Sequence, residues 1–127
     1  FLKRVLRALM IKAENILQNR LEYFKNKDYE KIFNIYSHNS EFRSYFESSD
    51  KYGEYFNNLV EMFIPESIEI YKVLYNNESA EILFLEKIRD LKENKLVYCY
   101  SKSYFVLEEG SWKILKEIRE STLNKGI

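Results

Sequence analysis

The first half of the chain has the hydrophobic spacing of helices. Apolar residues recur at steps of three and four from Phe1 to Phe24, with no Gly or Pro between them, and this spacing predicts one long amphipathic helix. Asp28 is placed to cap a second, short helix. Two further helical stretches are predicted after the polar breaks at 37–40 and 48–50.

The second half has the spacing of strands. After Pro65, β-branched and aromatic residues predict strands at 66–75, 80–89, 96–107 and 112–119. Helices followed by an antiparallel meander predict an α+β fold, with the helices packed on a curved sheet of four or more strands.

The last two predicted strands form a hairpin whose two-residue loop is Glu109-Gly110, where Gly110 supplies the positive φ of the turn. This register predicts pairs on both faces of the sheet: Leu107 with Trp112, Phe105 with Ile114, Lys102 with Glu117, and Tyr100 with Arg119. The first two pairs put Trp112 in the core or barrel wall, and the last two face the other way. A three-residue loop would instead oppose Lys102 and Lys116.

Length and composition fit one domain with a real core. The chain has 127 residues, 46% of them hydrophobic and 17% aromatic. We expect a single domain over 1–127, with a helical part at 1–65, an antiparallel sheet at 66–120 and a tail at 121–127.

Charge is balanced overall but uneven along the chain. The net charge is zero, while the first 20 residues carry five Lys and Arg side chains against Glu14 alone. A net charge of zero gives no general reason to expect nucleic-acid binding. The basic N-terminal helix could lie on an anionic membrane or a partner, or it could be a packing helix whose basic residues are solvated. Because the chain starts at Phe1 rather than Met, an upstream signal or anchor stays open, although a cytoplasmic location is favoured over export.

The sequence contains no residue pattern typical of a metal site or a redox site. The only His is His38 and the only Cys is Cys99, which excludes an intrachain disulfide and offers no ligand spacing for a metal. Cys99 lies within an apolar strand and is expected to be a buried thiol. No metal and no cofactor is predicted.

Two motifs resemble the NTF2-like superfamily, which includes SnoaL-like and cystatin-like folds. They are Asp28-Tyr29 after the first helix and the hairpin sequence from Glu109 to Ile114, and the resemblance covers roughly residues 20 to 120. It implies a cone-shaped α+β barrel with a pocket at its open end and dimers formed through the convex sheet face. The superfamily includes isomerases, dehydratases and epoxide hydrolases beside many binding and accessory domains.

Catalytic residues of the kind that enzymatic members carry are sparse. Such members place Asp or His toward the pocket, whereas Asp90 here falls at a turn and His38 in a polar loop. Glu86 interrupts the apolar alternation of the second strand, so an inward Glu86 without a cation would be a candidate general base. We expect instead that Glu86 is paired with Lys or Arg, or turned outward. Glu117, like the other strand glutamates, is expected to face solvent or pair across strands.

A row of tyrosines gives the candidate ligand-binding residues. Tyr98, Tyr100 and Tyr104 share one face of the third strand, and together with Trp112 they could surround a ligand in the cone. The favoured alternative is a convex aromatic face that packs in a dimer or lies partly in water.

These observations predict a non-catalytic NTF2-like domain that binds a small apolar ligand or a protein partner, as a homodimer formed through the sheet. A second hypothesis is a small cofactor-independent enzyme of the isomerase or dehydratase type, using Glu86 and tyrosine hydroxyls. A third is a membrane-associated accessory domain whose anchor precedes Phe1.

Overall fold

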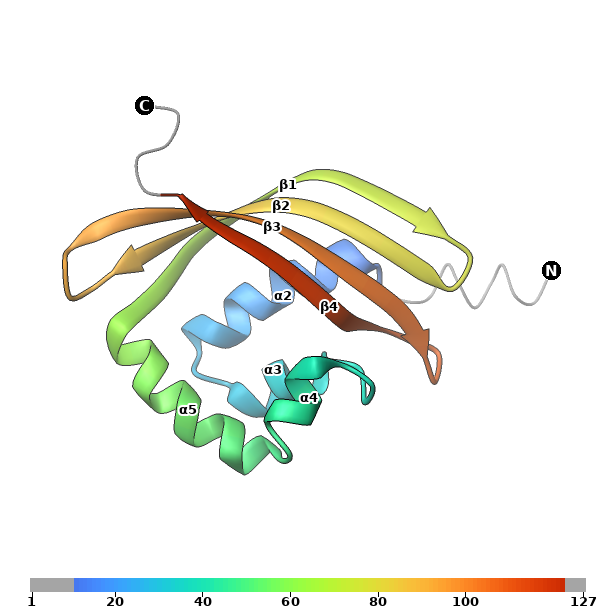
Figure 1. The fold of residues 1–127 in the computed structure, drawn as a ribbon, viewed down its shortest axis with the longest axis horizontal. Coiled ribbons are helices and arrows are strands. Elements are labelled where there is room, and N and C mark those ends of the chain that lie inside the picture. Colours follow the sequence, from blue (N-terminus) through green and yellow to red (C-terminus); the bar gives the residue numbers. More distant parts are fainter. Residues whose placement is uncertain (1–10, 123–127) are drawn as a thin grey trace.

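The computed structural model describes residues 11–122, which form four helices followed by four strands (Figure 1). The elements are α2 (Ala13–Lys25), α3 (Tyr29–Asn34), α4 (Glu41–Tyr45), α5 (Ser49–Met62), β1 (Phe63–Asn76), β2 (Ser79–Asp90), β3 (Lys95–Glu108) and β4 (Ser111–Thr122). The predictions made for residues 1–10, including most of the basic segment, lie outside the described residues.

Side-chain caps begin three of the helices. The Asp28 Oδ1 atom accepts a hydrogen bond from the Lys31 backbone N–H at 3.3 Å and starts α3. Ser40 and Ser48 cap α4 and α5 in the same way. Each cap satisfies a backbone donor that the first helical turn leaves unpaired. The predicted cap at Asp28 and the two predicted polar breaks are therefore confirmed.

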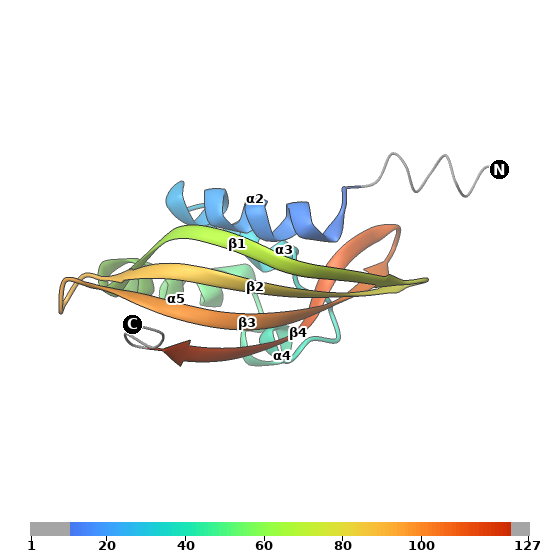
Figure 2. The same cartoon turned by 90° about the horizontal axis from the view of Figure 1, so that it is seen from above.

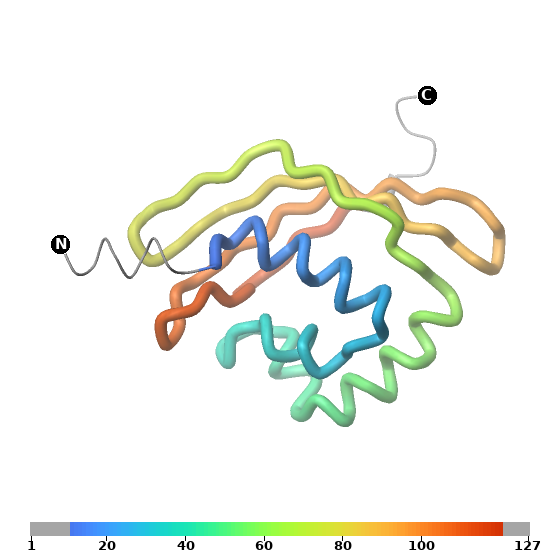
Figure 3. The backbone as a smooth tube through the Cα atoms, turned by 180° about the vertical axis from the view of Figure 1, so that it is seen from behind, coloured from blue at the N-terminus to red at the C-terminus, as the bar shows by residue number. Residues whose placement is uncertain are grey.

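The strands form one antiparallel sheet in the order β1-β2-β3-β4. The sheet is curved and open, and the helices cover its concave side (Figures 1 and 2). The reverse view shows α2 and α5 on that same side (Figure 3). The predicted α+β fold, with helices on a curved four-stranded sheet, is confirmed. The sheet begins at Phe63, earlier than the predicted start at 66, because α5 ends at Met62 and leads directly into β1.

Bulges shift the pairing register in both edge strands. In β1 the register shifts at Glu66 and again at Tyr71. In β4 it shifts at Leu115, which has no partner between the pairs that β3 makes with Ile114 and Lys116. An extra residue in one strand bends and twists the sheet locally, so these three positions are expected to contribute to its curvature.

The hairpin register is confirmed near the turn and wrong beyond it. Leu107 pairs with Trp112 as predicted, and Phe105 with Ile114. Past the bulge the predicted pairs are replaced: Ser103 lies opposite Glu117, Ser101 opposite Arg119, and Lys102 opposite Ile118. One extra residue moves every later side chain of a strand to the other face. Glu117 and Arg119 therefore point to the concave side rather than outward.

The core lies between the concave face and the helices. The largest fully buried apolar side chains come from both layers: Leu17, Ile32, Phe56, Ile82, Phe84, Phe105 and Ile114. Trp112 is buried beside them, with its ring 5.5 Å from that of Tyr75. Its predicted place in the core or barrel wall is confirmed.

A short parallel bridge joins the end of α3 to β4. The Ser37 N–H donates to the Ile114 carbonyl at 2.8 Å, and the Ile114 N–H donates to the Ile35 carbonyl at 2.8 Å. Tyr36 lies between these two bonds. Its backbone is therefore fixed against the sheet, and its side chain is held at the cavity described next.

Candidate ligand-binding cavity

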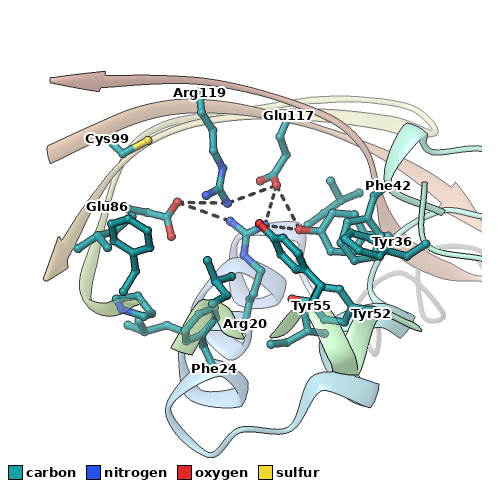
Figure 4. A pocket seen from close by; sticks show the side chains of 18 of the residues that line it. Arg20, Phe24, Tyr36, Phe42, Tyr52, Tyr55, Glu86, Cys99, Glu117 and Arg119 are labelled. Carbon is teal, nitrogen blue, oxygen red and sulfur yellow. Dashed lines mark hydrogen bonds and ion pairs between the residues drawn. The ribbon is translucent and has the colours of Figure 1, made fainter. Parts of the chain in front are cut away.

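A cavity of about 720 Å³ lies between the concave face of the sheet and the helices (Figure 4). Its helix-side wall is mostly aromatic: Phe24, Tyr36, Phe42, Tyr45, Phe46, Tyr52 and Tyr55. Tyr45 on α4 and Tyr55 on α5 are exposed to solvent, so this part of the wall is in contact with solvent.

The aromatic wall is organised around Phe42. Its ring stacks on Tyr36, with centroids 3.8 Å apart and planes 12° apart. It also meets the edges or tilted faces of Phe46 at 5.1 Å and Tyr52 at 5.0 Å. Rings packed in this way hold each other in place. The wall is therefore an apolar surface built from rings that contact one another.

Four charged side chains from three different elements lie at the sheet end of the cavity. This charged cluster consists of Arg20 from α2, Glu86 from β2, and Glu117 and Arg119 from β4. Two positive and two negative charges cancel within it, so the cluster carries no net charge.

The ion pairs of the cluster meet at two carboxylate oxygens (Figure 4). Arg20 Nη1 donates to Glu117 Oε1 at 2.8 Å, and Arg119 Nη2 lies 3.5 Å from the same oxygen. Glu86 Oε1 lies 3.4 Å from Arg119 Nη2 and 3.9 Å from Arg20 Nη2. The Arg20–Glu117 contact is thus the tightest of the four.

Glu117 is the most strongly held member. Besides Arg20 it accepts hydrogen bonds from the Tyr36 hydroxyl at 3.3 Å and from the Ser103 hydroxyl. Burial alone would raise the pKa of Glu117, but Arg20, Arg119 and the Ser103 hydrogen bond outweigh it and lower that pKa to about 2. Burial and the Glu117 charge raise the pKa of Tyr36 to about 12. Neither group changes its protonation near neutral pH.

The structure shows both the direction in which the Glu86 side chain points and the partners with which it pairs. It is buried and points to the cavity, as the apolar alternation of β2 allows. It is also paired with two arginines, which confirms the expected pairing.

The predicted ligand-binding residues lie elsewhere. Tyr98, Tyr100 and Tyr104 do not line the cavity. Side chains alternate between the two faces of β3, and the concave face of this strand carries small buried side chains such as Ser103. On the convex side the Tyr100 ring stacks on Tyr71 at 6.2 Å. The placement matches the favoured alternative of a convex aromatic face rather than a ligand contact inside the cone.

Trp112 is also absent from the cavity wall. Its side chain packs among the core residues near Tyr75 instead. The prediction that Trp112 contacts a ligand in the cone does not match this position.

Sequence reasoning missed three members of the charged cluster. Arg20 falls on the helix face that also carries Ala13, Leu17 and Phe24, and it is buried, so the expectation of solvated basic residues is wrong at Arg20. A charge on an apolar stripe was the available signal. The hairpin pattern predicts Glu117 and Arg119 on the outer face, because the strand sequence gives no sign of the bulge at Leu115.

Cys99 lines the cavity as a buried thiol, as expected. Over residues 11–122, no three His, Cys, Asp or Glu side chains gather closely enough to hold a metal ion. Within the same range, no helix combines the length and apolar character needed to cross a membrane.

Comparisons with known proteins identify the fold. No protein-family model and no curated protein matches the sequence. The structure is similar to a SEC-C motif containing protein from Rhodopseudomonas palustris, with a TM-score of 0.68 and 13% identity over 84% of this chain and 77% of that chain. A ketosteroid isomerase-like protein from Erwinia carotovora atroseptica has a TM-score of 0.65 and 12% identity over 87% and 93%. An NTF2-like protein of unknown function from Pseudomonas putida has a TM-score of 0.62 and 9% identity over 89% and 86%.

The chain therefore has the NTF2-like, cystatin-like fold that its hairpin and first helices resemble. Identities at this level show the fold alone, since one fold carries many functions.

Proposed function

We propose that this domain binds a small, mainly apolar molecule in its cavity and does not catalyse a reaction on it. The observation that carries the proposal is a cavity of about 720 Å³ with an aromatic wall and an internally neutralised charged end. Ligand sites typically combine an apolar surround with a few fixed polar groups. Flat ring systems fit best, because ring faces and edges such as those of Phe42 and Tyr52 line the wall.

The state of the carboxylates supports binding over catalysis. Glu117, with a pKa of about 2, stays ionised and bound to Arg20. Glu86 Oε1 is paired with two guanidinium groups, Arg119 at 3.4 Å and Arg20 at 3.9 Å. An isomerase or dehydratase needs an acid or base that exchanges a proton near neutral pH. These ion pairs oppose such a role for either residue.

Filling the cavity is expected to abolish binding. Val97 lines it from β3, so Val97→Trp places a bulky ring inside. Val106 alternates with buried Phe105 on the same strand and faces the convex side, so Val106→Trp is the matched control. In a fluorescence titration with the neutral probe N-phenyl-1-naphthylamine, wild type and Val106→Trp should bind equally. Val97→Trp should bind at least about tenfold more weakly, as steric exclusion from a pocket requires.

Melting curves first show that both variants are folded. Equal binding by Val97→Trp and wild type, or equal losses in the two variants, would count against a ligand in the cavity.

We also propose that the domain forms a homodimer through the convex sheet face. Large apolar side chains are exposed on that face: Tyr71, Leu83, Tyr100 and Ile118. Exposed apolar patches of this kind mark interaction sites. Sedimentation at micromolar concentration should give twice the 15.5 kDa chain mass. Tyr100→Lys should give the monomer, whereas Leu91→Lys, in the exposed β2–β3 turn, should not. If the wild-type protein is monomeric at high concentration, the dimer proposal is wrong.

A further inference from the structure

Resting on the proposed function, we infer that the ligand is a neutral molecule ending in a hydroxyl group that donates a hydrogen bond to Glu86 and accepts one from Arg119. The inference comes from the hydrogen-bonding capacity that the charged cluster leaves unused on the cavity side.

Glu86 supplies an unused acceptor. Both of its ion pairs go through Oε1, and Oε2 makes neither a hydrogen bond nor an ion pair within residues 11–122. Oε1 itself is buried without a hydrogen-bond partner, and so is Arg20 Nη2, 3.9 Å away. The side chain is 11% exposed and lines the cavity. A carboxylate can only accept hydrogen bonds, so a ligand group beside it must donate.

Arg119 supplies unused donors next to that acceptor. Its ion pairs go through Nη2, and its Nε and Nη1 atoms have no hydrogen-bond partner in the described part of the chain. The side chain keeps 43% of its surface exposed and borders the cavity. Arg119 Nη2 is 3.4 Å from Glu86 Oε1, so one small ligand group can reach both residues. A hydroxyl both donates and accepts.

The charges around this point exclude ionised ligand ends. An ammonium group beside Glu86 would also face two guanidinium groups, at 3.4 and 3.9 Å from the same oxygen. A carboxylate beside Arg119 would face both Glu86 and Glu117. Like charges at such distances repel, and the cluster has no net charge to attract either ion.

A ligand without a polar end is also disfavoured. Filling the cavity removes solvent from Glu86 and Arg119, and a charged group that loses water without a new partner is costly. Sites built to hydrogen-bond a hydroxyl therefore reject analogues that lack it.

Three biphenyl probes that differ only at one end test the inference, through displacement of N-phenyl-1-naphthylamine. The wild-type protein should bind 4-phenylphenol about tenfold more tightly than 4-methoxybiphenyl, which cannot donate a hydrogen bond to Glu86. It should also bind 4-phenylphenol about tenfold more tightly than biphenyl-4-carboxylate. A difference of this size is what the loss of a hydrogen bond to a charged group implies. Glu86→Gln keeps the shape but gives the cluster a positive charge. It should weaken 4-phenylphenol about fivefold and tighten biphenyl-4-carboxylate.

Glu81→Gln is the matched control, because Glu81 lies on the same strand but pairs with Lys102 outside the cavity. It should leave all three affinities unchanged. Equal wild-type affinities for 4-phenylphenol and 4-methoxybiphenyl overturn the inference, and so does a Glu86→Gln variant that weakens all three probes alike. In both cases N-phenyl-1-naphthylamine still binds and Val97→Trp still blocks it, so the proposed function stands. If no probe binds, both the inference about the hydroxyl group and the proposed function are wrong.

Discussion

Arg20→Met is expected to destabilise the folded chain by about 3–5 kcal/mol, the usual loss when one partner of a buried ion pair is removed. Arg20 is buried with only 6% of its surface exposed, and it donates to both Tyr36 and Glu117. Without it, Glu117, whose side chain is only 11% exposed, keeps its charge and loses its closest cation. Urea denaturation at pH 7 measures the loss as a change in the free energy of unfolding.

Two further variants separate charge from packing. Lys25→Met removes an exposed cation from the end of the same helix and should change the stability by less than about 0.5 kcal/mol. Arg20→Met combined with Glu117→Leu removes both charges of the pair and should recover most of the loss. If the double variant is as unstable as Arg20→Met alone, the arginine stabilises the fold by packing rather than by neutralising Glu117.

Acid is expected to remove about 3 kcal/mol of stability through Glu117 alone. Its pKa is lowered from 4.5 to about 2 in the folded state, so the folded state binds the proton less readily than the unfolded chain. The stabilisation is fully present above pH 4.5 and is lost as the pH falls through 2. A difference of this size in pKa corresponds to about 3 kcal/mol.

Comparison with Glu117→Gln isolates this contribution from other carboxylates. The pKa of Glu108, for example, is also lowered, since hydrogen bonds from Ser37 and His38 outweigh the effect of burial. The free energy of unfolding of wild type should fall more steeply than that of Glu117→Gln between pH 4.5 and 2. Parallel curves would mean that Glu117 is not held in its charged form by the arginines.

Local patterns in the sequence predicted the elements well because local chemistry determines them. Asp28 caps α3 through a bond to a residue three positions later. The turn at Glu109-Gly110 needs positive φ, which is 53° at Glu109 and 80° at Gly110. Leu107 and Trp112 then pair directly across it. Each of these features depends on neighbours within a few positions.

The charged cluster could not be predicted because it depends on a bulge and on distant partners. Trp112 and Ile114 alternate with polar residues, and extending that alternation would place Ile118 inside. The bulge instead exposes Ile118 and turns Glu117 and Arg119 inward, where they meet charges from α2 and β2. Nothing within the strand's own sequence reveals those partners.

The two faces of β3 carry side chains of different size. The concave face of this strand carries Cys99, Ser101 and Ser103, all buried, whereas the tyrosines of the row face outward. Of these, Cys99 lines the cavity, and Ser103 donates a hydrogen bond to Glu117. The alternation of small and large residues was visible in the sequence, but which set faces inward depends on where the helices pack.

The most direct test of a ligand in the cavity is a two-dimensional ¹⁵N–¹H NMR titration with N-phenyl-1-naphthylamine. The cavity proposal predicts that chemical shifts change at the backbone amides of Arg20, Phe42 and Cys99, which line the cavity, and remain unchanged at Tyr104 and Val106, which do not line it and have no cavity residue beside them in the chain. Shifts confined to the tyrosine face, or none at saturating probe, would contradict it.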